Sequence, residues 1–112
     1  MATVTVGRTV LYTLTAQDAE QINRRRTDGA SIAARLAADP KEWPAGAQAH
    51  IGNPASEGLV VPLVIVAVWP HEFGEGVPGV NGQALLDGSD QLWVTSIREG
   101  SEPGTWRWPE RV

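Results

Sequence analysis

The chain has no cysteine and only two histidines among its 112 residues. Without cysteine there can be no disulfide, no thiolate nucleophile and no cysteine-ligated zinc or iron–sulfur site. His50 and His71 are 21 positions apart, which is not the short spacing of metal ligands on one helix or hairpin. We therefore expect neither a bound metal nor a cofactor.

Positive charge and long apolar runs are also scarce. The chain has nine Lys and Arg residues and thirteen Asp and Glu residues, which gives a net charge of −4. Nonspecific binding to nucleic acid needs a basic surface instead. The longest apolar run, residues 59–69, contains Pro62 and is too short to span a bilayer. The first residues show no basic segment followed by an apolar one. These absences predict a soluble, unexported protein that binds neither membranes nor, nonspecifically, nucleic acid.

No catalytic signature is visible in the sequence. Thr95 and Ser96 have no neighbouring base, and the Gly74-Glu75-Gly76 segment is too short and too acidic for a phosphate loop. Asp87 and Asp90 could form a carboxylate pair, but their position in a turn accounts for both through hydrogen bonds to the backbone. We expect that the protein is not an enzyme.

Glycine and proline, in contrast, are plentiful, with twelve and eight residues, and they favour short elements joined by turns. A chain of this length fits one domain, residues 1–112. Runs rich in Val, Thr, Ile and aromatic residues predict strands. These runs lie at residues 3–14, as one or two strands around Gly7, and at residues 47–51, 59–69, 80–86, 91–97 and 105–108. Asp87-Gly88 predicts a tight hairpin between two of them.

The predicted fold is mainly β, of the α+β class. It is a small, strongly bent, SH3-like antiparallel barrel of five to six strands, with a short helical insertion near the N-terminus. An open α+β sheet is the competing architecture. Because proline cannot donate to a strand ladder, the strand in residues 59–69 must begin after Pro62, or be an edge or a bulge there.

The helical insertion is expected at about residues 15–39, as two short helices lying against the sheet. Thr15 and Asp18 predict a capping box, and Thr27-Asp28-Gly29 predicts that the first helix ends near residue 26. Ser31 predicts the cap of a second helix, which Asp39-Pro40 ends.

Tryptophans and arginines gather near the end of the sequence. Alternate residues of a strand share a face, so Trp106 and Trp108 should point one way and Arg107 the other. The two indoles could sandwich a nucleobase, at about 1–3 kcal/mol per base, or fill the open end of the barrel. A guanidinium can stack on an indole and pair with an anion at once. The candidate ligand-binding residues are therefore Trp93, Arg98, Trp106, Arg107, Trp108 and Arg111.

Two further groups have simpler structural interpretations. Trp69 and Trp93 could join the same cluster, but large aromatic residues at the ends of strands usually belong to the core. Arg24, Arg25 and Arg26 follow one another on a helix, where successive side chains point about 100° apart. They are expected on a solvated face and not around one ligand.

A resemblance to small, mostly uncharacterised proteins common in bacteriophage and prophage genomes is carried by four segments. These are Val80-Asn81, Leu86-Asp87-Gly88, Leu92-Trp93-Val94-Thr95-Ser96 and Pro103-Gly104-Thr105-Trp106-Arg107-Trp108-Pro109-Glu110-Arg111. The similarity covers roughly the C-terminal half, including residues 60–69, and the Gly-Thr-Trp-x-Trp-Pro ending is its most distinctive part. In shorter relatives the helical segment is reduced or missing, which supports reading residues 15–39 as an insertion.

The resemblance implies a phage or prophage accessory protein and transfers no established active-site residue. Small non-enzymatic phage proteins often act by binding, and some disable host defence by sequestering a nucleotide messenger. We expect such an anti-defence protein, acting as a homo-oligomer in the host cytoplasm and binding a small nucleotide ligand. The alternative is a virion structural or assembly component, or a module that binds a phage or host protein.

Overall fold

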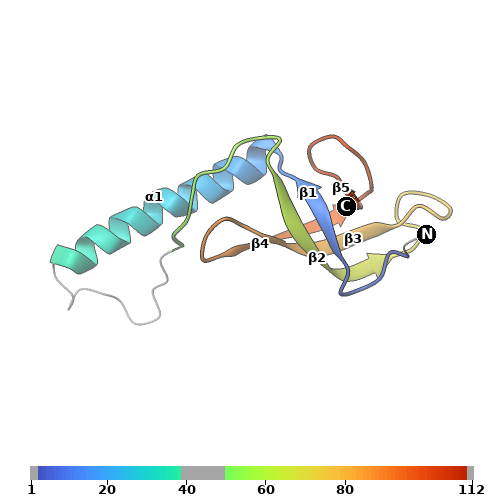
Figure 1. Cartoon of the computed structure of the whole chain (residues 1–112), viewed down its shortest axis with the longest axis horizontal. Helices are drawn as coiled ribbons and strands as arrows, with labels where there is room; N and C mark the ends of the chain where they lie inside the picture. Colours follow the sequence, from blue (N-terminus) through green and yellow to red (C-terminus); the bar gives the residue numbers. More distant parts are fainter. Residues whose placement is uncertain (1–2, 39–49, 111–112) are drawn as a thin grey trace.

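The computed structural model describes residues 3–38, with only the backbone for 32–38, and residues 50–110. The protein is mostly β, with one open five-stranded antiparallel sheet and one helix (Figure 1). The elements in chain order are β1 (Thr9–Thr13), α1 (Ala16–Ala38), β2 (Val60–Trp69), β3 (Gly79–Leu85), β4 (Gln91–Ile97) and β5 (Trp106–Arg107).

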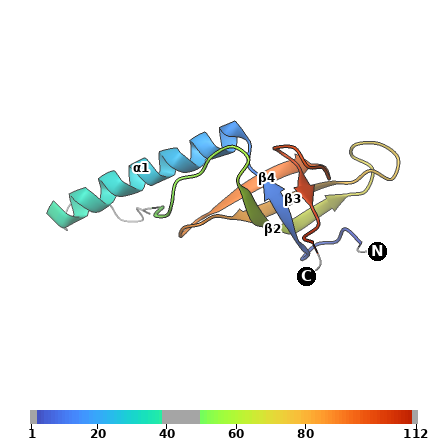
Figure 2. The ribbon, with the colours of Figure 1, turned by 45° about the horizontal axis from the view of Figure 1, so that its top comes forward.

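The sheet has the strand order β4-β3-β2-β1-β5, and its strands are strongly twisted, so that the sheet is curved (Figure 2). The curl brings β5 to the residues that follow β4: the Trp106 amide donates to the Arg98 carbonyl at 3.1 Å, and the Gly100 amide donates to the Trp106 carbonyl at 2.9 Å. This contact is a single isolated bridge and not a ladder. The predicted closed, SH3-like barrel is therefore not confirmed, and the competing open sheet is. The reason is that β5 is only two residues long, because Gly104 turns the chain before it and Pro109 cannot donate after it.

The strand predictions agree with the sheet to within a few residues. The first strand is confined to Thr9–Thr13 because Gly7, at a φ of 94°, forms a turn before it. Pro62 lies within β2, opposite Leu11 of β1, whereas the pairing of β2 with β3 begins one residue later. Pro62 thus has a neighbouring strand on one side only, which fits the expected edge position. The strand predicted at residues 47–51 falls mostly outside the described residues, and His50 and Ile51 are not in a strand.

The helical insertion is one continuous helix, so the prediction of two short helices is wrong. The capping box is confirmed: the Asp18 amide donates to Thr15 Oγ1 and the Thr15 amide donates to Asp18 Oδ2, both at 3.0 Å. The expected stop at residues 27–29 does not occur. Gly29 is buried within α1, and a Cβ there would lie 2.6 Å from the His50 carbonyl oxygen. The glycine therefore permits a close backbone crossing instead of ending the helix.

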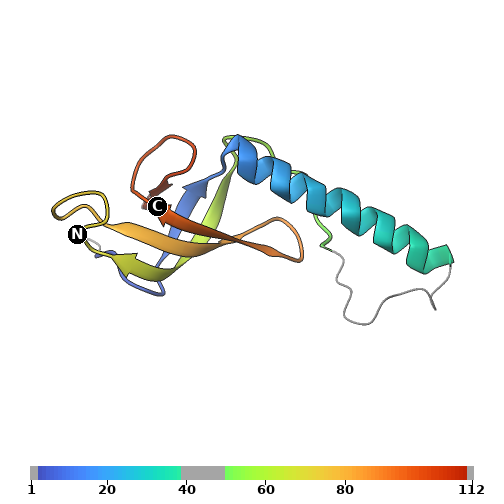
Figure 3. The same ribbon diagram turned by 180° about the vertical axis from the view of Figure 1, so that it is seen from behind.

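The core is enclosed mainly by the curved sheet itself, and α1 contributes Ile22 to it. It consists of the buried residues Val10, Tyr12, Leu14, Ile22, Val61, Leu63, Ile65, Val80, Ala84, Leu92, Val94, Ile97 and Trp106. Beyond these contacts α1 runs past the turn between β3 and β4 and away from the sheet (Figure 3). The helix is thus held by contacts of residues up to Gly29 and does not lie along the sheet as predicted. The opposite, convex side of β2, β3 and β4 faces solvent.

Candidate binding site

The tryptophans near the end of the sequence lie mainly in the core. Trp106 is fully buried, and Trp108 is half-buried with its ring edge-to-face against Trp106, at a centroid distance of 5.4 Å. Trp106 pairs with the buried Tyr12 and Arg107 with Leu11, so Arg107 points away from the core. Its guanidinium donates to Thr13 Oγ1 at 3.2 Å. This arrangement leaves no space between the two indoles for a stacked base.

The other candidate residues lie elsewhere on the molecule. Trp93 is 63% exposed on the convex face of the sheet, opposite Gln83 of β3. Arg98 is exposed after the end of β4 and pairs with Glu102 at 3.4 Å, and an exposed pair of this kind contributes little to stability. Arg111 lies outside the described residues. The proposed tryptophan and arginine residues therefore do not surround one site, because Trp93 and the buried Trp106 are on opposite faces of the sheet.

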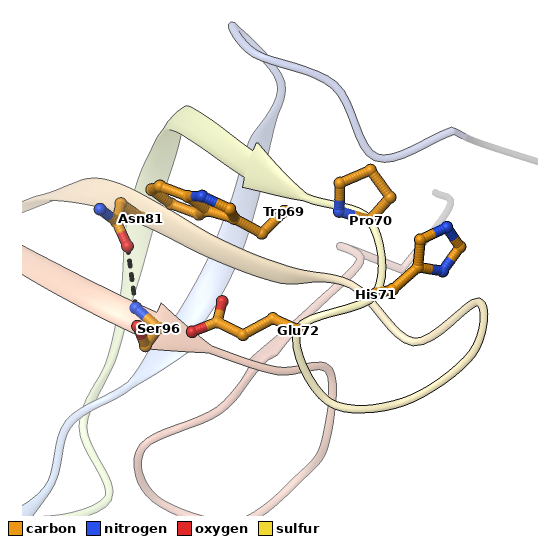
Figure 4. A pocket seen from close by; sticks show the side chains of 6 residues that line it. All are labelled: Trp69, Pro70, His71, Glu72, Asn81 and Ser96. Carbon is orange, nitrogen blue, oxygen red and sulfur yellow. Dashed lines mark hydrogen bonds between the residues drawn. The ribbon is translucent and has the colours of Figure 1, made fainter.

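A pocket of about 610 Å³ is found instead at the far end of β2, where the structure places residues that were not predicted as a site. Its lining residues are Trp69, Pro70, His71, Glu72, Asn81 and Ser96 (Figure 4). We call it the Trp69 pocket. The Trp69 ring forms one wall, Asn81 and Ser96 lie at one side, and the Glu72 carboxylate points into the space from the loop that follows β2 (Figure 4).

A bulge in β2 explains why Trp69 lines this pocket and is not in the core. Val61, Leu63 and Ile65 are buried, so uninterrupted alternation would also direct Trp69 inward. The register shifts between Ile65 and Ala67, and from there Val68 is the residue that packs against the core. Trp69 therefore points outward and is 47% exposed. The expectation that Trp69 and Trp93 belong to the core is wrong for both.

A second bulge, in β4, forms the opposite side of the pocket. The pairing with β3 shifts between Val80 and Gly82, and Ser96 has a φ of 53°, in the left-handed region. A non-glycine residue is rare in this region and costs about 1–2 kcal/mol. The strained backbone is held by the Asn81 side chain, whose Oδ1 accepts from the Ser96 amide at 2.8 Å. With its oxygen engaged, Asn81 presents its amide nitrogen as a donor.

The loop over residues 70–78 holds Glu72 in place. Its backbone is closed by hydrogen bonds from the Phe73 amide to the Val77 carbonyl at 3.1 Å and from the Gly76 amide to His71 Nδ1 at 2.8 Å. Gly79, the first residue of β3, has no side chain, and a Cβ there would collide with the Glu72 carboxylate. Glu72 can therefore lie over the backbone of β3 only because residue 79 is glycine.

A buried ion cluster joins α1 to the turn between β3 and β4. Arg25 Nη1 lies 3.1 Å from Asp90 Oδ2, and Arg26 Nη1 lies 2.9 Å from Asp90 Oδ1. The second contact is an ion pair without hydrogen-bond alignment. The Asp90 side chain is 2% exposed and that of Arg26 is 9% exposed. Burial alone would raise the pKa of Asp90, but pairing with the two arginines outweighs burial and holds the pKa below its ordinary value.

The same cluster fixes the segment after residue 50. Arg26 Nε donates to the Asn53 carbonyl at 3.1 Å, and Asn53 Nδ2 donates to Asp87 Oδ2 at 2.8 Å. Gly52 forms a bridge with Gly88, and a side chain at either position would collide with the other strand or with the guanidinium. We call the set Arg25, Arg26, Asn53, Asp87 and Asp90 the Arg26 junction.

The Arg26 junction corrects two sequence interpretations. Arg24 is exposed beside Glu20, as expected, but Arg25 and Arg26 converge on one carboxylate instead of facing solvent. Asp90 is a buried partner of both, and not an ordinary turn residue. Because two guanidinium groups share the buried Asp90 carboxylate, and the other partners that the described residues show are groups of the chain itself, the role of the Arg26 junction is structural.

No family model, no curated protein and no solved structure matches this chain. Within residues 3–38 and 50–110, no three acidic or histidine side chains lie close enough together to hold a metal ion. Over the same residues, the one helix is not apolar enough to cross a membrane. The Trp69 pocket is therefore the strongest binding-site candidate in the described part of the chain, and its function is argued from its own chemistry.

Proposed function

We propose that the protein is a non-enzymatic binding protein and that the Trp69 pocket takes the flat base of a nucleotide. The observation that carries the proposal is the placement of the Glu72 carboxylate opposite the exposed ring of Trp69 (Figure 4). An indole offers a stacking surface for any base, at about 1–3 kcal/mol. A carboxylate accepts hydrogen bonds only, so it selects a ring edge that carries N–H donors.

Guanine fits this pocket best among the bases. Its Watson–Crick edge presents two neighbouring N–H donors, which one carboxylate can accept together, whereas adenine presents a ring acceptor beside its amino group. Asn81 adds a donor for a carbonyl oxygen of the base, and its orientation is fixed by the hydrogen bond from the Ser96 amide. The proposed ligand is therefore a guanine-containing nucleotide, and the proposed role is sequestration of such a nucleotide messenger.

The phosphates of such a ligand would remain in water. No arginine or lysine is among the residues that line the pocket, and Glu72 repels anions. Binding should therefore depend on the base and only weakly on the number of phosphates or on salt. This dependence distinguishes the proposed site from a phosphate-binding site, in which affinity rises with each phosphate.

The test is calorimetric titration of the purified protein with guanosine, GMP, GTP, AMP, CMP and N-acetylarginine amide. We expect similar affinities for the three guanine compounds, and weaker binding of AMP and CMP. Trp69→Ala should weaken GMP binding by about 5- to 150-fold, which is the equivalent of the stacking energy, and Glu72→Gln should remove the preference for guanine. The matched controls are Trp93→Ala and Glu75→Gln, which lie outside the pocket.

Three results would count against the nucleotide. Absence of binding across the panel at millimolar ligand, or equal losses in the pocket and control variants, would exclude a base in this pocket. Binding of N-acetylarginine amide in preference to GMP would indicate that the carboxylate and indole receive an arginine side chain of a protein partner instead.

We also propose, from the resemblance of the Thr105-Trp106-Arg107-Trp108-Pro109 ending, that this is a phage or prophage accessory protein acting in the host cytoplasm against a defence system. In this proposal the open sheet is related to an SH3-like barrel, and it stays open because β5 is only two residues long. The two hydrogen bonds between β5 and the residues after β4 support the comparison.

A virion or assembly component remains the second candidate. The observation that favours it is the apolar tip of the loop over residues 70–78, where Phe73 is 42% and Val77 is 44% exposed. Exposed apolar residues on a protruding loop are typical of contacts with neighbouring subunits. Detection of the protein in purified particles would support this candidate, whereas its absence from particles that contain the other structural proteins would exclude it.

A further inference from the structure

The convex face of β2, β3 and β4 is an apolar surface that no described part of the chain covers. Val66 is 43% exposed, Leu85 37% and Trp93 63%. The helix packs against the opposite, concave side, through Ile22. Large exposed apolar patches mark interaction surfaces.

This surface also lacks charge. The strands β2, β3 and β4 contain no Asp, Glu, Lys or Arg at all, although a fifth of the chain is charged. A partner that recognised the face by charge would find no complementary group on it. A second copy of this chain, which carries the same net charge of −4, meets the least electrostatic repulsion at a surface where neither copy presents a charge.

The register of the strands adds self-complementarity. Val64, Gln83 and Trp93 form one row across the three strands, with Gln83 on the central strand of the row. A two-fold axis through this row brings Gln83 against its own symmetry copy, and a primary amide can donate to and accept from an identical amide. The apolar Val64 and Trp93 then lie on either side of that pair.

We propose that a second copy of this chain covers the convex face, giving a symmetric homodimer in which the two β2–β3–β4 faces stack. The interface is formed by the side chains of Pro62, Val64, Val66, Gln83, Leu85 and Trp93. The dimer does not depend on a nucleotide, so its test is independent of the function proposed for the Trp69 pocket.

Sedimentation velocity of the full chain at about 100 µM, without any nucleotide, tests the proposal. We expect a dimer for the wild type. Val66→Lys and Trp93→Lys each place two like charges in the interface and should raise the dissociation constant at least tenfold, toward a monomer. Ile51→Lys is the matched control, because Ile51 is 61% exposed and lies beside Ser89 of the β3–β4 turn, outside the three strands of the face; this variant should remain dimeric.

Val66 separates face stacking from the other way in which two such sheets could join. The outer edge of β4 is unpaired along the strand, and addition of a partner strand there would involve Trp93 but not Val66, which is two strands away. A dimer that resists Val66→Lys, or a wild-type monomer at this concentration, would overturn the proposal. Far-ultraviolet circular dichroism of each variant establishes whether the charge has unfolded the sheet. If Val66→Lys is unfolded, Gln83→Lys provides the same test, because Gln83 lies on the central strand of the row and not on the outer edge of β4. This variant should be monomeric, and a folded dimer of it would overturn the proposal.

Discussion

Replacement of Asp90 by asparagine should destabilise the protein by about 2–3 kcal/mol. The substitution keeps the shape of the side chain and one acceptor oxygen, but it removes the charge that both Arg25 and Arg26 face. Removing one partner of a buried ion pair costs about 3–5 kcal/mol because the other charge is left uncompensated. The loss expected here lies below this range, since asparagine keeps an acceptor oxygen and the Arg25 side chain is 24% exposed and can be hydrated, although that of Arg26 is only 9% exposed.

Urea unfolding at pH 7, followed by far-ultraviolet circular dichroism, measures this loss. For a chain of this size, about 2–3 kcal/mol also corresponds to a fall in Tm of roughly 10 °C. Asp87→Asn is the control, because Asp87 is an exposed neighbour whose carboxylate accepts a hydrogen bond from Asn53, and it should change the free energy of unfolding by no more than about 0.5 kcal/mol. Equal effects of the two substitutions would refute the assignment of Asp90 as a buried ionic partner.

The pH dependence provides a second measurement on the same variant. The pKa of Asp90 is lower in the folded state than its ordinary value near 3.9. Its ionised form therefore contributes fully above about pH 4, and the contribution is lost as the pH falls below that value toward the folded-state pKa. The difference in unfolding free energy between wild type and Asp90→Asn should narrow in this acidic range and stay constant between about pH 5 and pH 8.

Three other substitutions test separate parts of the fold. Burial and the hydrogen bond to Asp18 raise the pKa of Tyr12, so the folded state retains the phenolic proton at a pH where the unfolded state loses it. The free energy of unfolding of the wild type should therefore fall as the pH rises above about 10, and urea unfolding of Tyr12→Phe should show no such loss. Gly29→Ala should lower the Tm, although alanine favours helices by about 1 kcal/mol, because its Cβ meets the His50 backbone; a higher Tm would contradict the close crossing. Ser96→Gly should raise the unfolding free energy by about 0.5–1 kcal/mol, since glycine relieves the left-handed φ, and a clear loss in urea would show that the bulge is not strained.

Local features of the fold were predictable from the sequence because their signals are local. The capping box needs only Thr15 and Asp18, three residues apart. The hairpin is present where Asp87-Gly88 predicts it, but its connection spans residues 86–90 and is not a tight turn with a positive φ at Gly88. The continuous helix was not predictable from the same rules. The stop signal at Gly29 is overridden by a contact with His50, which comes from a distant part of the sequence.

The candidate site was missed for a related reason. Strand alternation predicts which residues share a face only while the register is unbroken. The bulge between Ile65 and Ala67 reverses which residues of β2 face the core, and so exposes Trp69. The second bulge gives Ser96 a positive φ, which the sequence does not indicate because the residue is not a glycine. The convergence of Arg25 and Arg26 on Asp90 likewise depends on tertiary packing between residues more than sixty positions apart.

The Arg26 junction has a consequence for the order in which the chain folds. It requires α1, the segment at Asn53 and the turn at Asp90 to be in place together, so its contacts can form only after the helix and the β3–β4 hairpin have come together. Contacts that form after the folding barrier leave the folding rate nearly unchanged and retard the reverse reaction. The junction should therefore slow unfolding. Asp90→Asn should raise the unfolding rate, while the refolding rate stays close to that of the wild type.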